Sequence, residues 1–139
     1  MKYRLFDAEG SASKGIRIIL EEIEAKYELT YATTDRTIPR SKEHLLLNPN
    51  GWVPVLTWGK NSMYEASAIT IFLCDRHPKY GLAPSISSNE RALFLQTLVY
   101  FSSSVQNAFQ LDYYPDRFTD CKEFEFSAQR RGHRKLRET

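Results

Sequence analysis

One stretch of the chain, residues 48–69, constrains the fold more than any other, and it reads NPNGWVPVLTWGKNSMYEASAI. Its first four residues have the composition of a tight turn, because proline presets φ and glycine accepts a positive φ. Pro54 has no N–H to donate to a strand ladder, so a strand should begin there. Gly59 and its neighbours predict a second turn, and Glu65 leads into a helix with apolar periodicity. The stretch therefore predicts a turn, a hairpin and a helix, in that order.

This order leaves two sets of unused backbone groups at one end of the predicted hairpin. One set lies around Val53, where the strand edge begins, and the other lies at the helix start at Glu65. A strand edge can pair with an extended peptide, and a helix N-terminus favours an anion. A ligand that is both peptide-like and anionic is therefore suited to this end.

The residues before this stretch predict a βαβ unit. Lys2–Phe6 has the pattern of a short strand, and residues 27–31 alternate as in a second strand. The helix between them should have one apolar face, made by Ile16, Ile19, Leu20 and Ile23. A crossover of this length joins parallel strands in the right-handed sense. With a short helix at 41–47, the predicted order is β-α-β-α-β-β-α, an α/β fold with a mixed four-stranded sheet.

The remainder of the chain predicts a linker and an all-α part. Residues 81–88 contain glycine, proline and three serines, a composition typical of linkers. A long helical pattern follows over residues 89–114, with one apolar stripe that includes Val99 and Phe109. A further helix lies near the end, but so short a segment has little to bury them against. We therefore expect a first domain at 1–80, a linker at 81–88 and an incomplete helical domain at 89–139, which could rely on another subunit.

Composition narrows the functional classes. The net charge of the 139 residues is only +2, which argues against nucleic acid or a membrane as a partner. No apolar run approaches the roughly 18 residues that span a bilayer, and the N-terminus has no signal-peptide pattern, so a cytoplasmic location is expected. Cys74 and Cys121 are far apart and lack the spacing of zinc ligands, so no metal is expected.

The segments NPNGWVPVL and YEASAITIFL together resemble the N-terminal domain of cytosolic glutathione S-transferases. In that family an NPxGxVPxL stretch precedes a hairpin and an E-S/A-x-A-I helix start. The resemblance implies a thioredoxin-like domain over residues 1–80, followed by a helical domain that is truncated here. It also implies a transferase that conjugates the thiolate of glutathione, its co-substrate, to a small hydrophobic electrophile, and that forms a homodimer.

The resemblance also implies roles for particular residues. The Val53-Pro54 bond should be cis, which turns the Val53 N–H and C=O toward the cysteinyl backbone of glutathione. Glu65 should accept a hydrogen bond from the α-amino group of the ligand. Glu65 and Ala66 open the helix whose N-terminus faces the γ-glutamyl carboxylate, and Ser67 is a possible substitute for the serine hydroxyl that Ala66 lacks.

The residue that activates the thiol is left open between two serines. Family members carry a tyrosine, serine or cysteine after the first strand, and here the tyrosine position holds Leu5 or Phe6. Ser11 and Ser13 lie where the serine and cysteine types carry their residue, and we prefer Ser11 because it lies further out in the loop. Both serines could instead simply cap the first helix, since serine is a leading N-cap residue.

Two positions depart from the family pattern and support a second hypothesis. Ala66 stands where many members have a serine, and Trp52 stands where a glutamine or lysine often reaches the glycyl end of glutathione. Lys42 or His44 could replace that contact, although an ordinary surface position is the expectation for each. The alternative function is a non-catalytic binding or assembly module of the same fold. A thiol–disulfide oxidoreductase is disfavoured, because no cysteine lies near Ser11.

Overall fold

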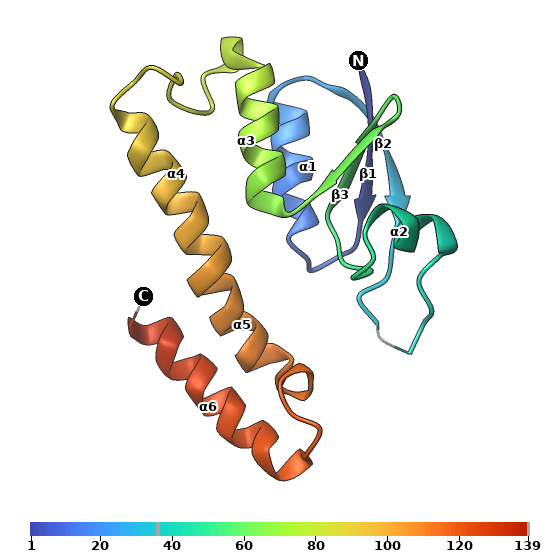
Figure 1. The fold of residues 1–139 in the computed structure, drawn as a ribbon, viewed down its shortest axis with the longest axis vertical. Helices are drawn as coiled ribbons and strands as arrows, with labels where there is room; N and C mark the ends of the chain where they lie inside the picture. Colours follow the sequence, from blue (N-terminus) through green and yellow to red (C-terminus); the bar gives the residue numbers. More distant parts are fainter. Residues whose placement is uncertain (36, 139) are drawn as a thin grey trace. The chain divides into compact units, whose positions relative to one another are not determined.

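A computed structural model describes residues 1–35 and 37–138 and divides the chain into two compact units, Met1–Ser88 and Asn89–Thr139 (Figure 1). Position 36, in the predicted loop, and position 139, in the predicted helical domain, lie outside the described residues.

The first unit contains the predicted elements in the predicted order. They are β1 (Lys2–Asp7), α1 (Ser13–Glu22), β2 (Lys26–Tyr31), α2 (Lys42–Leu47), β3 (Val55–Trp58), β4 (Asn61–Tyr64) and α3 (Ala66–Arg76). A short 3₁₀ turn, Pro78–Tyr80, follows α3. The order β-α-β-α-β-β-α is thus confirmed.

The four strands form one mixed sheet in the order β2-β1-β3-β4. β1 runs parallel to β2 and antiparallel to β3, and β4 is antiparallel to β3. Phe6 pairs with Val55, and Val55 pairs with Tyr64. The end of β1, the start of β3 and the end of β4 therefore lie at the same end of the sheet. We call this end, where the three strands begin or finish, the Val55 edge.

Side-chain alternation along β1 assigns the two faces of the sheet. Tyr3 and Leu5 point to one face and are buried. There they form the main core with residues of α1, β3 and α3, namely Ile16, Leu20, Ile23, Leu56, Ile69 and Leu73. α1 and α3 lie side by side on this face (Figure 1).

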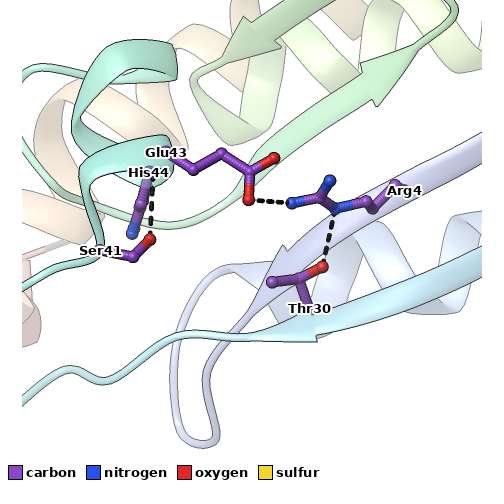
Figure 2. A network of polar contacts seen from close by, with 5 residues as sticks. All are labelled: Arg4, Thr30, Ser41, Glu43 and His44. Atoms are coloured by element: carbon purple, nitrogen blue, oxygen red, sulfur yellow. Dashed lines mark hydrogen bonds and ion pairs between the residues drawn. The ribbon is translucent and has the colours of Figure 1, made fainter.

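The opposite face of β1 carries α2. Arg4 donates to Thr30 Oγ1 at 2.8 Å, and its Nη2 lies 2.7 Å from Glu43 Oε2, as Figure 2 shows. The hydrogen bond from Arg4 lowers the pKa of the Glu43 carboxyl. Ser41 caps the helix by accepting from the His44 N–H at 3.1 Å. These contacts attach the short α2 to the sheet at a defined place.

The second unit is a helical hairpin with an irregular first arm. That arm consists of α4 (Glu90–Tyr100), a π-helical segment (Phe101–Val105) and α5 (Gln106–Tyr113); the turn Pro115–Arg117 and α6 (Lys122–Glu138) follow. A Cβ on Gly132 would lie 2.6 Å from Asp112 N and 2.8 Å from Ala108 O, so α6 approaches the backbone of α5 at this glycine. None of the helices in the described ranges is long and apolar enough to cross a membrane.

The predicted apolar stripe on the first arm is only partly correct. The helical run from 89 to 114 is confirmed, but Val99 and Phe109 are exposed, and the buried residue of α5 is Ala108. The π-helical segment contains an extra residue per turn, which rotates the faces of α5 relative to those of α4. Uniform α-helical spacing therefore does not carry across residues 101–105.

Candidate functional site

The strand register brings three separate parts of the sequence to the Val55 edge. Residues 8–12 follow β1 at this edge, because Phe6 pairs with Val55. Val53 and Pro54 lie directly before β3 at the same edge. Glu65 follows β4 there, because Tyr64 also pairs with Val55. The residues that sequence reasoning selected are therefore placed by topology around one end of the sheet.

Ser13 is fully buried, and its hydroxyl is committed to the protein. Its Oγ donates to Asp7 Oδ1 at 2.5 Å and accepts from the Ala8 N–H at 3.2 Å. The Asp7 side chain is buried as well. The alternative in which Ser13 caps the helix is wrong, because Ser13 is the first residue of α1 and Ala12 is the N-cap residue.

Ser11 lies outside the helix and is half-buried. Its Oγ donates to Ala8 O at 2.7 Å, lies 2.7 Å from Ser13 Oγ and accepts from the Ser13 N–H at 3.2 Å. Since the Ser13 proton goes to Asp7, the Ser11 proton is the one of the pair that can be redirected to another acceptor. Ser11 is therefore the serine that can contact a ligand while Ser13 and Asp7 stay in place.

The Val53–Pro54 peptide bond is cis. Val53 is half-buried and Pro54 is buried. Within residues 1–35 and 37–138, the Val53 N–H has no hydrogen bond. The segment thus presents an unused backbone donor at the Val55 edge, as strand addition requires.

Two buried side chains hold the residue before Val53. His44 Nε2 and Asn48 Nδ2 each lie 3.0 Å from the Trp52 carbonyl oxygen. A carbonyl only accepts, so the His44 proton must be on Nε2. The Trp52 side chain is 53% exposed. The expectation that His44 is an ordinary surface residue is wrong, because the residue is only 2% exposed and its ring packs against Phe6 with ring centroids 5.2 Å apart.

A sequence signal for this pair does exist, although it is faint. His44 and Asn48 are spaced i, i+4, which places them on one side of a helical turn. The apolar Leu45–Leu47 run between them resembles a buried face, yet Leu46 is 85% exposed. The polar residues, not the leucines, face inward here. Lys42 is exposed, as expected.

Glu65 joins β4 to α3 in an unusual backbone conformation. Its φ is 76° and its ψ is 111°, a region that residues with a Cβ seldom occupy. The side chain is exposed, and its carboxylate has no partner within the described ranges. Glu65 is the N-cap residue of α3, so the first N–H groups of the helix, those of Ala66 and Ser67, lie beside it.

Two surface hollows lie away from these residues. One, of about 710 Å³, is at the other end of the sheet from the Val55 edge and is lined by Met1, Lys2, Trp58, Gly59, Asn61 and Arg76. The other, of about 480 Å³, belongs to the helical unit and is lined by Asp112, Phe126, Gln129, Arg130, His133, Arg134 and Arg137. The predicted site is instead the open end of the sheet that we call the Val55 edge, where backbone groups are the main binding elements.

Comparisons with known proteins concern mainly the first unit. Residues 1–75 match the model of the glutathione S-transferase N-terminal domain family. Glutathione S-transferase 1 of Schizosaccharomyces pombe is 41% identical over 61 residues, which are 42% of this chain and 27% of that protein. Glutathione S-transferase 2 of the same yeast is 40% identical over 63 residues, again 27% of its length. The chain thus matches about a quarter of the length of these relatives.

Solved structures resemble nearly the whole chain. A sphingomonad glutathione S-transferase complexed with glutathione is 27% identical, with a TM-score of 0.80, and the match covers 97% of this chain and 65% of that one. A glutathione transferase homologue from Sulfitobacter with bound glutathione has a TM-score of 0.83 at 20% identity, covering 99% and 66%. The second likeness concerns the fold alone. The likeness covers both the thioredoxin-like domain and the helical part, and this chain spans about two thirds of the length of those proteins.

Proposed function

The chain belongs to the glutathione S-transferase family, and on that premise we propose that it binds glutathione at the Val55 edge and conjugates the thiolate to a small electrophile. The observation that carries the proposal is the N–H of Val53, which has no hydrogen-bond partner among the described residues and lies beside a cis proline, at the edge to which the register also brings Ser11 and Glu65. The sphingomonad relative complexed with glutathione supports the same ligand.

The proposed binding mode uses backbone groups for most contacts. The cysteinyl part of glutathione pairs antiparallel with Val53, as an added strand does. Its γ-glutamyl carboxylate lies at the N-terminus of α3, where the N–H groups of Ala66 and Ser67 are suited to an anion. Its α-amino group donates to the Glu65 carboxylate, which is exposed and has no partner in the described ranges. Trp52 lies beside the glycyl end.

Ser11 is the proposed activating residue. Its hydroxyl turns from Ala8 O toward the ligand sulfur and donates a hydrogen bond that favours the thiolate. The thiolate then attacks an electrophilic carbon, a C–S bond forms, and the leaving group departs with the bonding electron pair. Ser13 does not contact the ligand in this scheme, and it keeps the loop in place through Asp7.

The rest of the assignment follows the family. Residues 1–80 form the glutathione-binding domain, 81–88 the linker and 89–139 part of the helical domain. The second substrate is a small hydrophobic electrophile, the location is cytoplasmic and the protein is a homodimer. No metal takes part, because the serine hydrogen bond and the proximity of the two substrates generate and use the nucleophile.

A non-catalytic glutathione-binding module is the second candidate. Ala66 favours it, because this position has no hydroxyl to add a bond to the carboxylate. Trp52 also favours it, because an indole offers one N–H donor and no charge. A site that binds without turning over would tolerate both changes.

One experiment separates the two candidates. The 139-residue chain is passed over immobilised glutathione and eluted with free glutathione, and conjugation of a chloronitrobenzene is then followed by absorbance. We expect both retention and turnover. Retention without turnover would contradict the transferase and support the binding module, whereas no retention would contradict both.

A further inference from the structure

The carbonyl oxygen of Trp52 accepts two side-chain hydrogen bonds, more than a loop carbonyl needs. His44 Nε2 and Asn48 Nδ2 both donate to it at 3.0 Å, so both of its lone pairs are used. The two donors are 2% and 3% exposed, respectively. Two buried side chains thus fix the orientation of a single peptide group at the rim of the candidate site.

That peptide group contains the N–H of Val53. In a planar trans peptide the C=O and the N–H point in opposite directions, so the direction of one determines the direction of the other. When His44 and Asn48 draw the Trp52 carbonyl inward, the Val53 N–H must point away from them. This is the N–H that has no partner within the described ranges.

We propose that His44 and Asn48 are positioning residues that aim the Val53 N–H at the backbone of the bound thiol peptide. This inference rests on the proposed function, since it assigns the orientation of the same site. Neither residue contacts the ligand. Both act through the peptide plane of Trp52 and Val53, which they hold before the ligand arrives.

Each of the two donors is itself held by further contacts. The His44 ring packs on the Phe6 ring of β1. The Arg4 guanidinium lies 4.7 Å from the centroid of the Phe6 ring and forms an ion pair with Glu43. Figure 2 shows His44 and Glu43 on α2 with Arg4 reaching across from β1. The orientation of the imidazole is therefore set by the sheet as well as by α2.

Asn48 is held by the turn that it begins. Its Oδ1 accepts from the Asn50 N–H at 3.1 Å, and its backbone C=O accepts from the Gly51 N–H at 2.9 Å. Gly51 has a φ of +65°, and a Cβ there would lie 3.0 Å from Arg40 Cγ, so the turn also depends on this glycine. The Asn48 Nδ2 is left as the group that reaches Trp52.

A purely structural role makes a different prediction from a positioning role. If the two donors only satisfy a buried carbonyl, their loss should lower the free energy of unfolding and leave the affinity of the remaining folded protein for glutathione unchanged. If they aim the Val53 N–H, folded variants should bind glutathione more weakly. Affinity measured well below the melting temperature separates the two roles.

The test compares four variants with the wild type by calorimetric titration of glutathione, by thermal melting and by hydrogen exchange of the peptide covering residues 50–56. His44→Leu removes one donor, and Asn48→Asp replaces the other with a carboxylate while keeping an acceptor for Asn50. His44→Gln restores an amide N–H at a similar reach. Leu46→Ala, at an exposed position on the same helix, is the control.

We expect His44→Leu and Asn48→Asp to weaken glutathione binding by about 5- to 10-fold, the effect of losing roughly one hydrogen bond. Exchange in 50–56 should be faster in both, His44→Gln should recover most of the affinity, and Leu46→Ala should match the wild type. Unchanged affinity in folded His44→Leu and Asn48→Asp would overturn the proposal. If the wild type itself fails to bind glutathione, the proposed function fails; if it binds and the variants bind equally, only the positioning role fails.

Discussion

Ser13 Oγ donates a 2.5 Å hydrogen bond to Asp7 Oδ1, which joins the first turn of α1 to the last residue of β1. Both side chains are buried. Ser11, two residues away, is only half-buried, and its hydroxyl donates to the Ala8 carbonyl. Two serines that look alike in the sequence thus have different partners, and they should respond differently to mutation.

Ser13→Ala should destabilise the first unit. It leaves the buried Asp7 carboxylate without the hydroxyl donor, and a buried polar group that loses its partner costs about 1–3 kcal/mol. Denaturation in urea should therefore show a lower free energy of unfolding. Ser62→Ala, at an exposed position of β4, is the control and should change stability little. A Ser13→Ala protein as stable as the wild type would contradict this prediction.

Ser11→Ala should slow conjugation while leaving glutathione affinity nearly unchanged. A hydrogen bond to a charged group contributes about 1.5–3 kcal/mol, so its loss should lower the rate about 10- to 100-fold. The pKa of the bound thiol should rise, and the thiolate absorbance of the complex near the ultraviolet edge measures it. A variant with the wild-type rate would show that Ser11 does not activate the thiol.

Glu65 should lower the stability of the fold through its backbone conformation and strengthen glutathione binding through its carboxylate. Glu65→Gly relieves the positive φ of 76° and should raise the free energy of unfolding by about 1 kcal/mol, whereas Glu65→Ala keeps the strained backbone and should not. Both variants lose the carboxylate, so both should bind glutathione about tenfold more weakly. Equal stability of the two variants would argue against backbone strain, and retained affinity would argue against contact with the α-amino group.

Sequence reasoning reached the order of the elements because each was indicated by a local pattern. The helices and strands of the first unit follow from apolar spacing, and the turn at residues 48–51 follows from Pro49 and Gly51. The inward position of His44 could not be obtained in this way. It depends on Phe6, which is 38 positions away in the sequence and reaches His44 only once β1 and α2 have packed.

The different partners of Ser11 and Ser13 could not be predicted from the sequence for a similar reason. Serine is a good N-cap residue, so a local pattern assigns Ser11 and Ser13 to the same class. The difference between them is the carboxylate of Asp7, whose burial depends on the sheet. The apolar stripe of the second unit was misplaced because a π-helical segment leaves no clear mark in the sequence.

Gly132→Ala should destabilise the helical unit although alanine is the better helix former. A Cβ at this position would lie 2.6 Å from Asp112 N and 2.8 Å from Ala108 O, so α5 and α6 would have to separate. Gly15→Ala in α1 is the matched control, because no atom of the described residues outside its own helical turns lies within 4 Å of its Cβ position. It should raise the free energy of unfolding by about 0.5–1 kcal/mol. Thermal melting of both variants measures the difference, and a stabilised Gly132→Ala protein would contradict the close packing.

His77 should make the first unit less stable in mild acid. Its Nε2 lies 3.0 Å from the Tyr3 hydroxyl, and burial raises the pKa of Tyr3, so that hydroxyl stays protonated and donates to a neutral imidazole. Burial also lowers the pKa of His77 from its ordinary value of 6.5, and the positive charges of Arg76, Lys79 and the N-terminal amine lower it further. In the folded state His77 therefore binds a proton less readily than in the unfolded chain.

The direction of the pH effect follows from this difference. Above pH 6.5 the imidazole is mostly neutral in both states, and its contribution to stability is fully present. As the pH falls below that value the unfolded chain takes up the proton first, so the free energy of unfolding declines until the folded state is protonated too. Urea denaturation between pH 8 and pH 5 should show this decline in the wild type and a shallower one in His77→Gln, which cannot titrate. Equal slopes would mean that His77 has the same pKa in the folded and unfolded states.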